Sequence, residues 1–156
     1  MKLSTGLLAG AAAGAAGTTA LNTATYLDMV LRGRPASSTP DQTVEKLADV
    51  SHLTVPGDQD TRGNRVSALG ALTGILAGVG VGVALGAARA VGWRPGPVAA
   101  GVVTGAGALL AGNGPMTVLG VTDPRSWAAT DWISDLVPHL AYGAVAGPVL
   151  HRLTRP

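Results

Sequence analysis

The sequence predicts an all-α fold: an integral membrane four-helix bundle packed through glycines, with a short amphipathic helix in the first loop. Three observations support this prediction. Four long segments carry few or no charges, glycine recurs in them at four-residue spacing, and only 13% of the residues are charged whereas 47% are hydrophobic. A soluble domain carries about 25% charged residues, so the deficit favours a membrane protein. We expect a single membrane domain over residues 1–156.

The segment 66–88 is the clearest of the four predicted spans. It is uncharged, lies between Arg65 and Arg89, and has glycine at every fourth position from 70 to 86. In water, each glycine would weaken a helix by roughly 0.5 to 1 kcal/mol relative to alanine. In lipid, backbone groups have no water to bond, so an apolar segment of about 20 residues is helical whatever its composition.

Glycines recur similarly in the other three spans, which we place at about 5–31, 97–112 and 132–152. A four-residue repeat drifts by about 40° per step around a helix, so one glycine stripe should meet more than one neighbour. We expect close helix packing at Gly6, Gly10, Gly14, Gly70, Gly74, Gly78, Gly82, Gly86, Gly101, Gly105, Gly143 and Gly147. These contacts serve either a bundle within one chain or a homo-oligomer.

The first span has a second interpretation. Lys2, an alanine-rich apolar stretch and small residues near Ala20 also form the pattern of a cleaved signal peptide. Against cleavage, the alanine and glycine core is weakly hydrophobic, and apolar residues continue through 27–31, past such a site. We expect the span to be retained, with cleavage as the open alternative.

Residues 32–65 form the only long hydrophilic loop. The Thr-Pro-Asp-Gln sequence at 39–42 predicts a helix start, with threonine as N-cap, proline in the first turn and glutamine at the capping-box position. A short helix to about residue 53 should follow, with Val44 and Leu47 on its apolar face. Before the second span, we expect the chain to be loosened by Pro56, Gly57, Gly63 and Asn64.

The third span should be interrupted. The turn that follows Arg89 is short, so the second and third spans should be antiparallel neighbours. The Gly-Asn-Gly-Pro sequence at 112–115 should end or kink the helix, because proline removes a backbone donor and clashes with the preceding turn. Residues 116–121 should then be irregular or re-entrant. Asp123 and Pro124 predict another cap and first turn.

Polar residues gather at one end of the predicted bundle. Asp131, Asp135 and His139 should share one side of a helix, because they are four residues apart. Ionisable groups at membrane depth are costly and normally face the bundle interior or a wet cavity. We therefore expect a polar vestibule lined by Asn22, Tyr26, Asp28, Asn113, Asp131, Asp135, His139 and Tyr142.

Three roles are open for this vestibule. It can be structural, with carboxylates stabilised at a helix N-terminus. It can bind or pass an ion, a proton or a small polar group, since histidine titrates near neutral pH. Asp131, Asp135 and His139 can also hold a divalent metal, although the chain has no second ligand helix with comparable spacing. HExxH, GxSxG and phosphate-loop patterns do not occur, so we expect no catalytic residue, cofactor or metal site.

Charge counts set the expected location. The N-terminus, the 89–94 turn and the C-terminal tail would share one side with five basic residues and no acid. Positive residues in short loops direct insertion, so we expect a multi-pass protein of the bacterial cytoplasmic membrane with both termini in the cytoplasm, although Arg32 and Arg34 argue the other way. The basic residues form no stripe that would bind nucleic acid.

Several motifs resemble a family of small multi-pass membrane proteins of high-GC actinobacteria. They are Tyr-Leu-Asp-Met at 26–29, Arg-Gly-Arg-Pro-Ala-Ser-Ser-Thr-Pro at 32–40 with Gln-Thr-Val-Glu at 42–45, Gly-Pro-Met-Thr at 114–117, Asp-Trp-Ile-Ser-Asp at 131–135 and Pro-His-Leu-Ala-Tyr-Gly at 138–143. The resemblance covers most of the chain. It implies a membrane location and about four spans, and it assigns no catalytic residue.

The expected function is that of a non-enzymatic structural or accessory subunit. Its glycine faces and polar vestibule would engage membrane lipids and a membrane-protein partner or a second copy of the chain. The alternative is a small channel or transporter for an ion, a proton or a small polar solute. A metal-dependent membrane enzyme is the third hypothesis.

Overall fold

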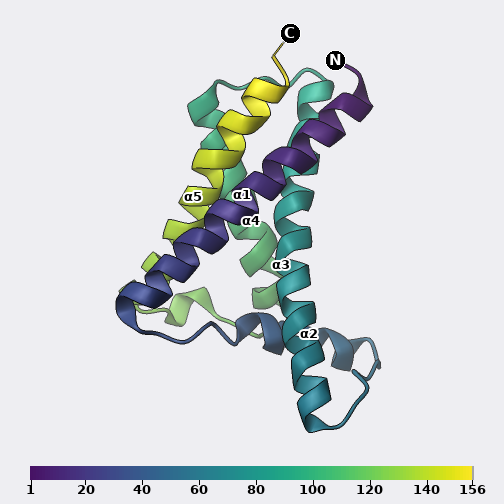
Figure 1. Ribbon diagram of the computed structural model, residues 1–156, viewed down its shortest axis with the longest axis vertical. Helices are drawn as coiled ribbons and strands as arrows, with labels where there is room; N and C mark the ends of the chain where they lie inside the picture. Colours follow the sequence, from purple (N-terminus) through teal and green to yellow (C-terminus); the bar gives the residue numbers. More distant parts are fainter. Residues whose placement is uncertain (156) are drawn as a thin grey trace.

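The computed structural model describes residues 1–155 and is built from helices (Figure 1). The long helices are α1 (Leu3–Arg32), α3 (Gln59–Ala90), α4 (Pro97–Val118) and α5 (Ala129–Leu153); α2 (Thr39–Val50) and the 3₁₀ turn η1 (Pro124–Ser126) are short. The described part of the chain contains no strand, which confirms the predicted all-α class.

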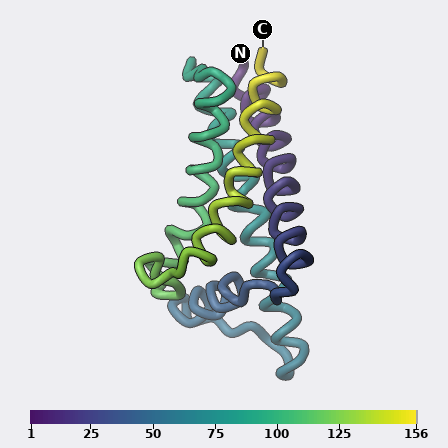
Figure 2. The backbone as a smooth tube through the Cα atoms, turned by 90° about the vertical axis from the view of Figure 1, so that its left-hand side faces the viewer, coloured from purple at the N-terminus to yellow at the C-terminus, as the bar shows by residue number. Residues whose placement is uncertain are grey.

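The long helices run up and down in one bundle (Figures 1 and 2). Both termini and the α3–α4 turn lie at one end, here called the termini end. α2, the start of α3 and the loop that carries η1 lie at the other, the loop end. α1 packs against α3 and α5, and α5 also packs against α4. α3 and α4 are antiparallel, as predicted, but each has its main contact elsewhere, α3 with α1 and α4 with α5.

Near the termini end, α1 and α3 approach each other through glycines. The facing pairs are Gly6 with Gly86, Gly10 with Gly82 and Gly14 with Gly78. A Cβ atom added to Gly14 would lie 2.9 Å from the carbonyl oxygen of Gly78, which is too close for two unbonded atoms. α4 and α5 meet similarly, through Gly101, Gly105, Gly143 and Gly147. Side chains at these positions would force the backbones apart.

Beyond Gly78, α1 and α3 diverge toward the loop end (Figure 1). A Cβ atom on Gly74 would have no neighbour within 4 Å, so Gly74 does not belong with the packing glycines among which it was predicted. A Cβ atom on Gly70 would lie 3.1 Å from Asp41 Oδ1 and from Pro40 Cβ in α2. The glycine stripe of α3 therefore meets α1 at one end and α2 at the other.

Small side chains fill the bundle interior. The buried apolar residues are Ala9, Ala13, Val44, Val66, Ala100, Ala108, Tyr142, Ala146 and Leu150. Large apolar side chains point outward on every long helix: Leu8, Leu76, Val98 and Leu140, one from each, are 66% to 79% exposed. This distribution is the reverse of that in a water-soluble bundle, where leucine and valine fill the core.

Within residues 1–155, one helix, α3, is long and apolar enough to cross a membrane by length and composition. It extends beyond the predicted span 66–88 at its start. Pro56 and Gly57 lie in the loop, as expected, but Gly63 and Asn64 are helical, so the prediction is wrong for these two residues. The cause is an N-cap: Asp58 Oδ1 accepts a hydrogen bond of 2.8 Å from the Thr61 amide and starts the helix before the apolar segment.

The predicted interruption of the third span is also wrong. α4 continues through Pro115 to Val118, so residues 116–118 are helical and not irregular or re-entrant. Pro115 lies in the last turn of the helix, where it removes one hydrogen bond and no long helical segment follows. The Thr117 hydroxyl also donates to the Asn113 carbonyl over 2.8 Å, which stabilises this turn.

The short helix predicted in the first loop is α2. Its N-cap is Ser38 and not Thr39, and it ends at Val50 instead of residue 53. Gln42 Nε2 donates to Ser38 Oγ over 3.0 Å. The predicted apolar face, with Val44 and Leu47, borders a cavity of about 640 Å³ whose other wall belongs to α3.

Candidate functional site

A polar cluster of Asn113, Asp135 and His139 joins α4 to α5 toward the loop end. Asn113 Nδ2 donates to Asp135 Oδ2 over 2.7 Å, and His139 Nδ1 lies 2.7 Å from the Asp135 carbonyl oxygen. The side chains of His139 and Asp135 are only 15% and 20% exposed. A carbonyl oxygen only accepts, so Nδ1 carries the hydrogen, and Nε2 is directed toward α4 beside Gly112.

A second polar cluster ties the end of α1 to the start of α5. Asp28 Oδ2 accepts from Arg32 Nη2 over 2.7 Å and from Arg34 Nε over 2.5 Å. Arg32 Nη2 also donates to the Ser134 hydroxyl. Asp131 lies nearby on α5, where its Oδ2 accepts from the Ala128 amide over 2.9 Å and caps the helix. These contacts stabilise the packing of the end of α1 against the start of α5.

Three predicted vestibule residues lie outside both clusters. Tyr142 is fully buried in the bundle core and donates to the carbonyl oxygen of Gly78, so it does not line a polar vestibule. Tyr26 is 60% exposed on the outside of α1. Asn22 is half-buried and makes no side-chain hydrogen bond within the described residues. The eight predicted residues therefore do not surround one shared cavity.

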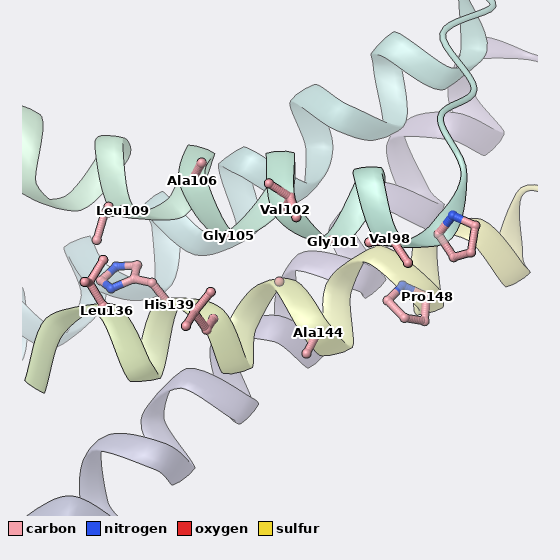
Figure 3. A pocket seen from close by; sticks show the side chains of 13 residues that line it. Val98, Gly101, Val102, Gly105, Ala106, Leu109, Leu136, His139, Ala144 and Pro148 are labelled. Carbon is pink, nitrogen blue, oxygen red and sulfur yellow. The ribbon is translucent and has the colours of Figure 1, made fainter. Parts of the chain in front are cut away.

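An apolar groove of about 600 Å³ runs between α4 and α5 (Figure 3). Gly101, Gly105 and Gly143 form its floor, because the two backbones meet there. Its residues are Pro97, Val98, Gly101, Val102, Gly105, Ala106, Leu109, Leu136, His139, Leu140, Gly143, Ala144 and Pro148. Figure 3 shows Val98 and Pro148 toward one end and His139 with Leu136 toward the other. We call this the α4–α5 groove.

Arg89, in the sequence only a charge that flanks the segment 66–88, is a functional candidate in the structure. It is 3% exposed and lies at the termini end. Its guanidinium donates to Thr154 Oγ1 over 3.0 Å and to the Pro95 carbonyl over 3.3 Å, and it lies 3.2 Å from His151 Nδ1. Its buried Nε has no hydrogen-bond partner within the described residues. Arg89 follows Gly86 by three residues and so shares its inward face. This spacing is the feature of the sequence that indicates a buried arginine.

Charge is divided between the two ends of the bundle. The termini end carries Lys2, Arg89, Arg94, Arg152 and Arg155, and the described residues there include no acidic side chain. All nine acidic residues belong to the loop end and its neighbouring helix turns, together with six basic residues. Within residues 1–155, no carboxylate side chain pairs with the buried Arg89, which makes the termini end favourable to anions.

Metal binding has no support in the geometry of residues 1–155. No group of three or more histidine, aspartate or glutamate side chains is placed to hold a metal ion there. Asp131 is engaged at the helix cap, so it does not join Asp135 and His139 as a third ligand.

Comparisons of the chain with protein-family models, with curated proteins and with solved structures found no match. The resemblance to actinobacterial membrane proteins therefore stays a prediction.

Proposed function

We propose that this chain is a four-span protein of the bacterial cytoplasmic membrane and a non-enzymatic structural or accessory subunit. Its outer surface would engage lipid and a membrane-protein partner or a second copy of the chain. The observation that supports this proposal is the reversed distribution of side chains, with leucine and valine outside and glycine and alanine inside. Exposure of such a surface to water costs about 25 cal/mol per Å², and lipid removes that cost.

Helix length agrees with this proposal. The shortest long helix, α4, has 22 residues. At 1.5 Å per residue it is about 33 Å long, which matches a hydrocarbon core of about 30 Å. Glycine, alanine and threonine residues of α1, α4 and α5 occupy the faces where these helices meet. The large apolar residues of the same helices are on the outward faces.

Cysteine labelling tests the number of spans. The chain contains no cysteine, so single substitutions can be labelled with a membrane-impermeant maleimide without background. Ala36→Cys and Arg125→Cys at the loop end should react in intact spheroplasts. Val91→Cys and Arg155→Cys at the termini end should react only after permeabilisation. If α3 alone crossed the membrane, Arg125→Cys would instead behave like Val91→Cys, and the four-span proposal would be wrong.

A transport function is the second candidate, and the Asn113–Asp135–His139 cluster favours it. Shielded ionisable groups at membrane depth commonly mark ion or proton pathways. The interior beside this cluster is filled by Tyr142, Ala146 and Ala108, which favours the accessory role. Reconstitution in liposomes separates the two: a proton flux that His139→Ala abolishes, with thermal unfolding unchanged, would replace the accessory proposal. A second polypeptide retained in native mass spectrometry would support the accessory role.

A further inference from the structure

We propose that the α4–α5 groove holds one anionic phospholipid, with an acyl chain along the groove and the phosphate at the termini end. This inference rests on the proposed membrane location and names a ligand for it. The groove volume of about 600 Å³ lies within the range of roughly 300 to 1,000 Å³ typical of sites that bury a small ligand. Its walls are apolar except for His139 at the far end.

The length of the groove matches that of a lipid acyl chain in one leaflet of the bilayer. On α4, the lining residues extend from Pro97 to Leu109, twelve residues apart. At 1.5 Å per residue this distance is about 18 Å, which is close to half of a hydrocarbon core of about 30 Å. The glycine floor leaves room for the acyl chain beside the two helix backbones, while Val98 and Leu140 form the walls of the groove.

Two arginines follow or precede the residues that line the groove at the termini end, which we call its mouth. On α5, Leu140, Ala144 and Pro148 line the groove at four-residue spacing, and Arg152 is the next residue on that side. Arg94 lies in the α3–α4 turn, three residues before Pro97. Both arginines are exposed, and neither forms an ion pair with the described residues. A phosphate at this level would be neutralised by two cations.

The buried Arg89 gives this end a second, independent preference for anions. Its only polar contacts within the described residues are neutral: a hydroxyl, a carbonyl and an imidazole nitrogen. The acidic side chains all lie toward the other end of the bundle. Within the described residues, no acidic side chain offsets the positive charge at this end of the groove, so charge complementarity selects an anionic headgroup over a zwitterionic one.

Native mass spectrometry of the full chain in mild detergent tests this inference, with dioleoylphosphatidylglycerol and dioleoylphosphatidylcholine as probes. We expect one bound phosphatidylglycerol and weaker phosphatidylcholine binding. A basic residue near an anionic lipid contributes roughly a fivefold change in affinity. Arg94→Gln with Arg152→Gln should therefore weaken phosphatidylglycerol about 25-fold and weaken phosphatidylcholine much less, because its ammonium group already offsets the charge of its phosphate. Lys46→Gln with Arg125→Gln, at the loop end, is the matched control and should change neither.

A second pair of variants tests occupation of the groove itself. Ala106→Trp fills the groove from an exposed position, and Ala84→Trp places the same side chain on an exposed face of α3 outside it. We expect Ala106→Trp to abolish the bound phosphatidylglycerol and Ala84→Trp to retain it, with equal thermal unfolding temperatures.

Three results would overturn the inference. They are equal binding of the two lipids, equal binding by the two tryptophan variants, or a second polypeptide that Ala106→Trp displaces while no phospholipid binds. If the cysteine labels still report four spans in any of these cases, the lipid site is wrong and the membrane proposal stands. Labels that report a different topology would instead reject the membrane proposal.

Discussion

The hydroxyl of Tyr142 donates a hydrogen bond of 2.5 Å to the carbonyl oxygen of Gly78 across the centre of the bundle. α3 and α5 otherwise make few contacts, so this bond connects two helices that α1 holds apart. The tyrosine ring occupies the space beside Gly17 of α1, where a Cβ atom would lie 2.8 Å from the ring carbons. Of the α3 glycines that contact α1, Gly78 is the one nearest the loop end, where α1 and α3 diverge.

Tyr142→Phe should lower the free energy of unfolding by about 1 kcal/mol, because it removes one buried hydrogen bond and keeps the ring. Tyr142→Ala should cost about 3 to 5 kcal/mol, because it also leaves a cavity. Unfolding in detergent measures both. Tyr26→Phe, on an exposed tyrosine, is the control and should behave like the wild type. A Tyr142→Phe variant as stable as the wild type would show that the bond contributes nothing.

Gly82→Leu should destabilise the bundle by about 3 kcal/mol or more, at the upper end of the cost of overpacking. A Cβ atom at Gly82 would lie 2.6 Å from the Cα and the amide nitrogen of Gly14, which are backbone atoms and cannot rotate away. Gly74→Leu is a matched control in the same helix and the same register, with open space around it. Thermal unfolding in detergent should separate the two variants; equal losses would contradict the glycine contact between α1 and α3.

Asn113 and Asp135 should be energetically coupled. A double-mutant cycle with Asn113→Ala and Asp135→Ala should give a coupling free energy of about 1 to 2 kcal/mol, because the hydrogen bond between the two side chains is partly buried and competes little with water. His139 keeps its contact with the Asp135 carbonyl oxygen in both variants, because that contact is to the backbone. Additive losses in chemical unfolding would mean that the two side chains do not interact.

The N-cap of α3 should make stability depend on pH. The hydrogen bond from the Thr61 amide lowers the pKa of the Asp58 carboxyl below its ordinary value of 3.8. Because the pKa is lower in the folded state, the stabilising contribution is complete above pH 3.8 and is lost as the pH falls through the folded value. Asp58→Asn keeps a capping oxygen and does not titrate. Its unfolding temperature should fall less on acidification than that of the wild type; parallel decreases would exclude this cap as a source of pH dependence.

The positions of the long helices could be predicted from the sequence, because uncharged segments and the polar loops between them are local features. Rules about single residues were less reliable. The glycine and asparagine at 63–64 predict a loosened chain, but the Asp58 cap starts the helix before them. Pro115 predicts an interruption, but it lies in the last turn of a helix, where it is tolerated. In both cases the neighbouring hydrogen bonds decide the outcome, and the residue type alone does not.

The site could be predicted only in part, because it depends on how the helices are rotated against one another. Asp135 and His139 share a face of α5, as their spacing requires, but Asp131 turns to the helix cap and Tyr142 to the core. The α4–α5 groove arises where Gly105 meets the His139 backbone. No pattern within either helix specifies that contact.

The small side chains inside the bundle reverse the usual direction of mutational sensitivity. In a soluble protein, trimming a buried leucine leaves a void, whereas surface positions accept many replacements. Here the interfaces of α1 with α3 and of α4 with α5 have almost nothing to trim, and only enlargement damages them. A deep mutational scan should therefore show the glycines of these two interfaces as the intolerant positions and outward leucines as freely exchangeable among apolar residues. Sequence drift in such a protein would alter its outer surface while the spacing of its helices stays fixed.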